Sequence, residues 1–169
     1  MPSTIRVRLA LFSQLVVAAC AAAVADQPPA LPPAVVQKQP DPGADGQRPW
    51  ADLPDSEVEK IRAALPATAE ARPQRPRKLL VFYRADGYPH ASIPHWNTLI
   101  QLLGEKTGAY EATLSQDYAD LMPGTIEQYD ALFFNNTCRM ATPPEVKTAI
   151  QAFVKGGKGF AGNHGAGDN

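Results

Sequence analysis

Hydrophobic and polar positions follow two alternating periods in the second half of the chain, and this alternation predicts an α/β fold. Four apolar strand patterns cover residues 79–83, 110–114, 130–135 and 160–163. The first is a continuous apolar run, which is typical of a strand buried on both faces. Helical patterns lie between the strands. Strands that alternate with helices favour a parallel sheet with right-handed crossovers, so we expect an open, mainly parallel sheet with flanking helices.

The apolar spacing also predicts which faces of these helices are buried. The helix at 93–108 turns Leu99, Leu102 and Leu103 inward and ends at Gly104 or Gly108. The helix that opens at 142–145 turns inward Val146, Ile150 and Val154. The glycine cluster at 156–159 precedes a strand, whereas a phosphate-binding loop follows one and opens a helix. We therefore interpret this cluster as a helix cap and turn.

The N-terminal residues have the pattern of a secretory signal. Arg6 and Arg8 precede an apolar run at 9–20, and a small-residue site at 23–25 precedes Asp26. The run is shorter than the ~20 residues of a membrane span, which disfavours an uncleaved anchor. Residues 17–20 also resemble a bacterial lipobox, in which Cys20 would be lipidated. Free export and a lipid anchor both remain open.

Composition sets the other boundaries. We expect a signal peptide at 1–25, a proline-rich disordered linker at 26–54, a short helix at 55–66, a basic proline-rich linker at 67–77 and the α/β domain at 78–169. Ser56 and Glu59 form a capping-box pattern for the short helix, and Pro66 ends it. We interpret the basic linker as a solvated hinge.

Charge and cysteine content narrow the classes of function. The formal net charge of −1 gives no indication of a nucleic-acid partner. Cys20 and Cys138 are the two cysteines of the sequence, and Cys20 lies in the targeting segment. Cys138 therefore has no intrachain disulfide partner, and no motif marks it as a nucleophile, so we expect an ordinary, partly buried thiol.

Polar residues gather where three predicted strands end. These loops cover 84–92, 135–139 and 164–168. In an open parallel sheet, ligands bind beyond the carboxyl ends of the strands, so the three loops should meet at one edge. We expect this edge to hold the functional site, with Arg84 and Tyr88 as candidates for substrate binding.

Two histidines, His90 and His164, lie in these loops. Two imidazoles can share general acid and base work near neutral pH. They can also bind a divalent metal, with Asp168 or Asp86 as the third ligand. Each histidine alone is equally compatible with a turn or core position satisfied by the backbone.

Other polar residues of this region have two interpretations. Asn136 and Thr137 can donate hydrogen bonds to an oxyanion or a sugar hydroxyl, or they can cap the end of the strand. His95 begins the first helix of the domain and is interpreted as a surface or cap residue.

Three of these motifs, at 79–94, 129–137 and 156–168, resemble the ThuA-like family, which is named for trehalose utilisation. The resemblance covers 78–169. It implies the class I glutamine amidotransferase-like superfamily and a flavodoxin-like sheet. It also implies a role in carbohydrate metabolism, with His90, His164 and Asp168 as polar signature positions.

The chain departs from the superfamily pattern at the strand-to-helix corner. His164 stands where the superfamily usually has a nucleophilic cysteine, so thioester glutaminase chemistry is not supported. The ThuA-like family more often has alanine-type residues at the positions of Gly165 and Gly167, and an apolar residue is common at the position of Asn163, so these departures should loosen the corner. A corner of this kind needs the helix that follows it, so we expect a C-terminally truncated domain whose last strand is an exposed apolar edge.

Together these features predict an exported hydrolase or lyase that acts on a small-molecule carbohydrate or glycoside. A divalent metal is a possible cofactor, and membrane contact is expected only through the signal peptide or a lipid anchor at Cys20. The alternative is a noncatalytic carbohydrate-binding or envelope interaction module.

Overall fold

The computed structural model describes residues 41–169. All described residues belong to one compact unit. The predicted signal peptide, the lipobox with Cys20 and the first part of the proline-rich linker lie outside the described residues.

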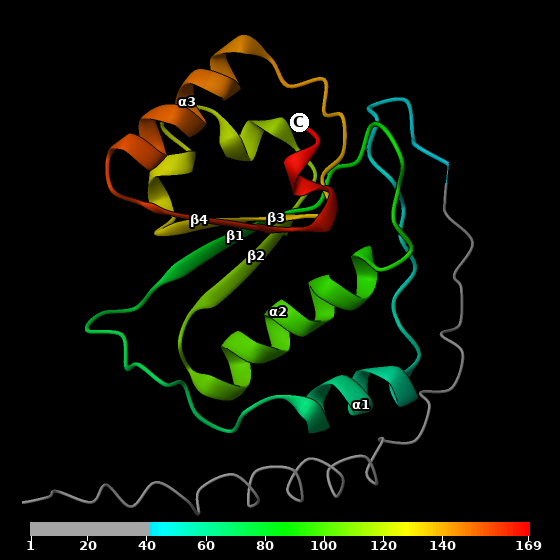
Figure 1. The fold of residues 1–169 in the computed structure, drawn as a ribbon, viewed down its shortest axis with the longest axis vertical. Coiled ribbons are helices and arrows are strands. Elements are labelled where there is room, and N and C mark those ends of the chain that lie inside the picture. Colours follow the sequence, from blue (N-terminus) through cyan, green and yellow to red (C-terminus); the bar gives the residue numbers. More distant parts are fainter. Residues whose placement is uncertain (1–40) are drawn as a thin grey trace, which may run out of the picture. The chain divides into compact units, whose positions relative to one another are not determined.

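A sheet of four parallel strands forms the centre of the described unit (Figure 1). The strands are β1 (Lys78–Phe82), β2 (Glu111–Ser115), β3 (Ala131–Asn135) and β4 (Gly159–Asn163), in the order β2-β1-β3-β4. This confirms the open, parallel, flavodoxin-like arrangement. β2 lies on one side of β1 and β3 lies on the other, so the direction in which strands are added reverses at β1. A crevice for ligands is therefore expected beyond the ends of β1 and β3.

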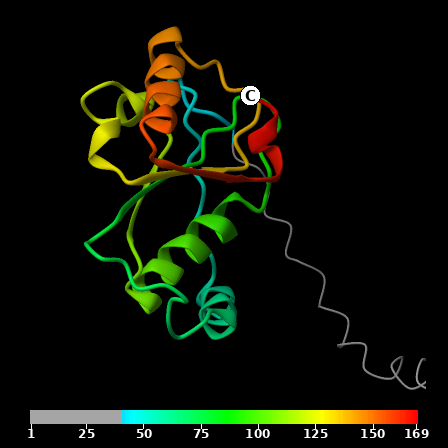
Figure 2. The same cartoon turned by 60° about the vertical axis from the view of Figure 1, so that its left-hand side comes forward.

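Helices cover both faces of the sheet (Figures 1 and 2). α1 (Asp55–Ala64) and α2 (Ile93–Thr107) lie on one face. The other face carries α3 (Pro144–Lys155) and the short 3-10 helices η1 (Tyr118–Leu121) and η2 (Ile126–Gln128). Gly108 caps the C-terminus of α2; it adopts a left-handed φ of 65° and donates its N–H to the Gly104 carbonyl. Across residues 41–169, every helix falls short of the length and apolarity that a membrane span requires.

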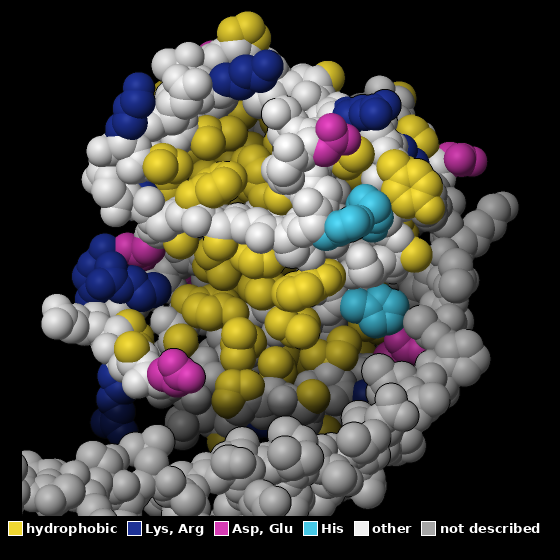
Figure 3. All heavy atoms as spheres, in the orientation of Figure 1, with side chains coloured by type: hydrophobic (Ala, Val, Ile, Leu, Met, Phe, Trp, Pro, Cys, Tyr) yellow, Lys and Arg dark blue, Asp and Glu magenta, His cyan; other side chains and the backbone are white. Residues whose placement is uncertain are grey.

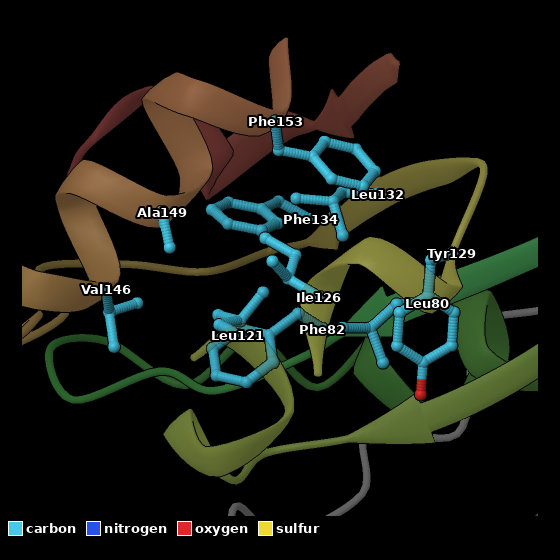
Figure 4. Close-up of a cluster of buried hydrophobic side chains, with 10 residues drawn as sticks. All are labelled: Leu80, Phe82, Leu121, Ile126, Tyr129, Leu132, Phe134, Val146, Ala149 and Phe153. Atoms are coloured by element: carbon cyan, nitrogen blue, oxygen red, sulfur yellow. The ribbon is translucent and has the colours of Figure 1, made fainter. Parts of the chain in front are cut away.

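The main core lies between the sheet and α3 (Figure 4). Phe82 and Phe134, from neighbouring strands, pack with ring centroids 5.8 Å apart. The predicted inner face of α3 is partly wrong: Val146 is buried and Ile150 packs against the core, but Val154 is 43% exposed. Ala149 and Phe153 occupy the inner face instead, because the helix is rotated toward the larger ring.

α1 begins differently from the capping-box prediction. Its N-cap is Pro54, with no side-chain cap, and Ser56 lies inside the first turn. Glu59 pairs instead with Arg62 at 3.4 Å. His95, which was expected to be a surface or cap residue, joins α2 to α1 through a 2.7 Å contact between its Nε2 and Glu57 Oε2.

Residues 41–54, expected to be part of a mobile spacer, lie against the domain. The backbone N–H of Arg48 donates to Gln116 Oε1, and Gln116 Nε2 donates to the Arg48 carbonyl, both at 2.9 Å. Trp50 packs against a small buried cluster, and Leu53 is 7% exposed. These two apolar side chains and the reciprocal amide contact order a segment whose composition is otherwise that of a linker.

The basic linker is also held in place. Arg75 and Arg77 form ion pairs with Asp130, whose second carboxylate oxygen accepts the Lys78 N–H at 2.9 Å. This backbone hydrogen bond, followed by the two arginines, lowers the pKa of Asp130 to about 2. The basic linker, which was expected to be a solvated hinge, therefore connects the start of β1 to the start of β3.

Candidate functional site

The three polar loops lie side by side at the carboxyl edge of the sheet. Ala85, Cys138 and Asp168 form a ladder of isolated parallel bridges that continues the order β1-β3-β4. Two backbone hydrogen bonds reinforce it, from Gly87 N to Cys138 O at 2.9 Å and from Arg139 N to Asp168 O at 2.7 Å. The predicted convergence of these loops is therefore present in the structure.

His164 occupies a sharp corner between β4 and the 3-10 helix η3 (His164–Gly167). Its φ of 42° is left-handed, a conformation that costs a non-glycine residue roughly 1–2 kcal/mol. Asn163, which precedes it, accepts the Asn136 N–H on Oδ1 at 2.8 Å and so fixes the end of β4. The corner therefore presents an exposed imidazole on a constrained backbone.

The expectation that glycine loosens this corner is wrong at Gly165. A Cβ there would lie 3.3 Å from His90 Nε2 and from the carbonyls of Asn136 and Thr137. Glycine lets η3 approach the β3 loop closely, which makes the corner tight. At Gly167 a Cβ would meet nothing within 4 Å.

His90 and His164 lie together, with ring centroids 4.4 Å apart and an interplanar angle of 73°. The exposed ring of Tyr88 packs edge-on against His90 at 4.9 Å. Figure 3 shows histidine side chains gathered beside a hydrophobic ring on this face. Burial, and then the charge of His164, lower the pKa of His90 below its usual value of 6.5. His90 is therefore a neutral imidazole at neutral pH, the form that accepts a proton.

The carboxylates expected beside the histidines have other partners. Asp168 accepts a hydrogen bond from Cys138 Sγ at 3.2 Å and pairs with Arg139 at 3.4 Å. Asp86 accepts from Arg84 Nε at 2.9 Å and from the backbone N–H of Ala141 at 2.8 Å. Within residues 41–169, no group of three or more His, Cys, Asp and Glu side chains is placed to hold a metal ion. The histidine pair thus has no carboxylate third ligand in the described part of the chain.

Three of the predicted substrate-binding residues are engaged inside the fold. Arg84 pairs with Asp86, lies over the Tyr118 ring at 4.7 Å and has a side chain only 12% exposed. Asn136 and Thr137 are 1% and 0% exposed. Tyr88, at 61% exposed, is the fourth candidate and faces solvent beside the histidines.

A chain of buried amides supports the floor of the site, and the sequence patterns did not reveal it. Asn135 Nδ2 donates to Asn97 Oδ1 at 2.8 Å, and Asn136 Nδ2 donates to Asn135 Oδ1 at 2.8 Å. In the described part of the chain, Asn136 Oδ1 and Asn163 Nδ2 are buried without a partner. The sequence feature that could have indicated this chain of amides is the occurrence of asparagines at the ends of β3 and β4, which are neighbouring strands.

Comparison with known proteins identifies one family. A family model described as ThuA, trehalose utilisation, matches residues 78–169, which is more than half of the chain. None of the curated proteins matches the chain, and none of the solved structures does.

Proposed function

Because the chain belongs to the ThuA family of trehalose utilisation, in the class I glutamine amidotransferase-like superfamily, we propose that it acts on a carbohydrate or glycoside through His90 and His164. The family gives the carbohydrate-related role. Acid–base cleavage of a carbon–oxygen bond, of hydrolase or lyase type, is the chemistry we propose for the site.

The histidine pair is the observation that carries this proposal. The two rings are 4.4 Å apart, close enough to serve one substrate. The lowered pKa keeps His90 neutral, so it accepts a proton from the substrate or from an attacking water. His164 donates a proton to the leaving oxygen as the carbon–oxygen bond breaks. We propose no thioester step, because the corner holds histidine where related proteins use cysteine.

A noncatalytic carbohydrate-binding or envelope interaction module is the second candidate. The engagement of Asp86 and Asp168 with other partners favours it, since no carboxylate orients the imidazoles within the described residues. Ring stacking on Tyr88 and hydrogen bonds to the histidines would be sufficient to bind a sugar.

Turnover on a panel of glycosides and sugar derivatives, measured with the full chain, tests the proposal. We expect His164→Ala and His90→Ala each to reduce kcat by about 10²–10⁴-fold, the usual contribution of a general acid or base. His95→Ala is the matched control, because the third histidine contacts α1 and should leave kcat unchanged. Bound metal is measured on the same samples. Saturable sugar binding without turnover, unchanged in His164→Ala, would overturn the proposed catalysis.

The pH profile gives an independent readout of His90. Because its pKa lies below 6.5, the rate should hold down to that pH and fall as the pH drops through the lowered value. His90→Ala should lose this acidic limb. A limb that persists in His90→Ala would assign it to another group.

We further propose that the protein is exported, either freely or as a lipoprotein anchored at Cys20. The basic, apolar and small-residue pattern at 1–25 supports export. The mass of the mature N-terminus, with and without globomycin, distinguishes cleavage after Ala25 from lipidation at Cys20.

A further inference from the structure

We infer that the pocket between residues 43–53 and α2 is a second ligand site, built for a neutral polyhydroxylated molecule of saccharide size. The pocket encloses about 550 Å³. This volume is within the roughly 300–1,000 Å³ range of small-molecule sites. None of Tyr88, His90 and His164 lines it, so this inference does not rest on the proposed function.

One wall of the pocket is a face of α2. Pro94, Asn97, Thr98 and Gln101 all line it, at the spacing i, i+3, i+4 and i+7 that places residues on one helix face, and the last three are polar. The side chains of Thr98 and Gln101 make no hydrogen bond to any of residues 41–169 and are available to a ligand. A helix face beside a sheet is usually apolar, so the Thr98 hydroxyl and the Gln101 amide here indicate a polar occupant, whereas Asn97 already accepts from Asn135 Nδ2.

The pocket also contains aromatic residues held in fixed positions. Trp50 and Tyr83 line it, and both pack against the buried cluster of Ala85, Ile93 and Cys138. Trp50 Nε1 is buried and has no acceptor among the described residues. A ligand hydroxyl beside the indole would supply that acceptor after a small shift of the ring. Aromatic faces together with neutral amides suit a molecule that has both C–H faces and hydroxyl groups.

The charges at the pocket do not favour an anion. Arg48 donates from Nε to the Ala85 carbonyl at 3.1 Å. Asp45 and Asp52 also line the pocket and add negative charge. A phosphate or carboxylate ligand would face these two carboxylates, whereas a neutral ligand would not.

The two tryptophans of the chain provide a matched test. Glucose, trehalose and adenine are titrated into the full chain, with binding followed by calorimetry and by tryptophan fluorescence. In Trp96→Phe, Trp50 is the remaining tryptophan, and Trp96 does not line the pocket. We expect this variant to bind the sugars as the unmodified chain does and to report binding by fluorescence.

Two variants at the pocket should weaken binding. Trp50→Phe removes the N–H donor and should abolish the fluorescence response and raise Kd at least threefold. Gln101→Ala removes an amide at a helical position where alanine is well tolerated, and should raise Kd similarly. Circular dichroism checks that both variants remain folded.

Four results would overturn the inference. The first is the absence of heat and fluorescence change with both sugars. The second is sugar binding that Trp50→Phe and Gln101→Ala leave unchanged. The third is binding of adenine in preference to the sugars. The fourth is loss of all sugar binding in His164→Ala, which would place the ligand at the histidine pair; loss of turnover alone in that variant would leave this site intact.

Discussion

At the scale of single residues, the site depends on how closely β4 and η3 approach the end of β3. A Cβ on Gly162 would lie 2.7 Å from the Ala166 Cβ and 3.2 Å from the Phe134 carbonyl. Neither neighbour is the movable end of a flexible side chain. Because Gly162 has no side chain, β4 and η3 can approach the end of β3 this closely. This packing sets the position of the His164 imidazole.

We expect Gly162→Ala to lower the free energy of unfolding by about 1–3 kcal/mol, the usual cost of overpacking. The matched variant Gly167→Ala meets open space and has no left-handed φ to oppose it. It should be neutral or stabilise the fold by up to about 1 kcal/mol, through the reduced freedom of the unfolded chain. Urea unfolding of both variants checks this. Equal destabilisation by the two would show that the contact at Gly162 has no special effect.

At the scale of elements, the Asp130 carboxylate fixes the start of β1 to the start of β3. It accepts the Lys78 N–H and pairs with Arg75 and Arg77. These contacts favour the ionised carboxylate in the folded chain. The same ionised group in an unfolded chain has only water, so the difference appears as a dependence of stability on pH.

Because the folded pKa of Asp130 lies near 2 and its ordinary value is 3.8, the contribution is complete above 3.8. It is lost as the pH falls from 3.8 through about 2. We expect Asp130→Asn to lower Tm at neutral pH and to reduce the loss of Tm over this acidic window. Glu105→Gln, at an exposed position of α2, is the control and should keep the slope of the unmodified chain. An unchanged slope in Asp130→Asn would contradict the prediction.

The strands could be predicted from the sequence because each is a short apolar run between turn residues. Their boundaries shifted by at most one residue, as β2 at Glu111–Ser115 shows against the expected 110–114. The buried face of α3 was harder to predict from the sequence, because Val154 and Phe153 are both apolar and only packing against the sheet selects Phe153. The order of residues 41–54 rests on Gln116, which lies 68 positions after Arg48, so local composition could not reveal it.

The convergence of the site loops was predictable, because a parallel sheet brings its carboxyl ends to one edge. The partners of individual side chains were not. Asp168 contacts Cys138 and Arg139, and Arg84 contacts Asp86. These partners depend on distances that cannot be read from sequence patterns. The sequence-based prediction assigned all of these residues to the site from residue type alone.

At the scale of the whole molecule, the sheet has two unlike edges. β2 presents exposed polar side chains, among them Glu111 and Thr113. β4 pairs with β3 on one side and has no strand on its other side within the described residues. Phe160 is 49% exposed there, and Ala161 beside it is also exposed. An uncharged edge of this kind can pair with another chain.

We expect the protein to associate with increasing concentration through β4, and Ala161→Lys to weaken this association several-fold. A lysine in the middle of an edge strand opposes pairing, because its charge would have to be desolvated. Sedimentation velocity over a range of concentrations measures the effect. Glu111→Lys, on the other edge, should leave the association unchanged, and a similar effect of both variants would exclude β4 as the contact.

The reciprocal hydrogen bonds between Arg48 and Gln116 also determine how the domain would respond to mechanical tension. A pull from the N-terminal side of residue 48 reaches these two bonds and Trp50 before it reaches α1. The segment would have to detach before the helices and the sheet are stretched. In a single-molecule pulling trace this would be seen as a short extension that precedes the main rupture. The site of His90 and His164 would therefore stay intact under forces that already lengthen the chain.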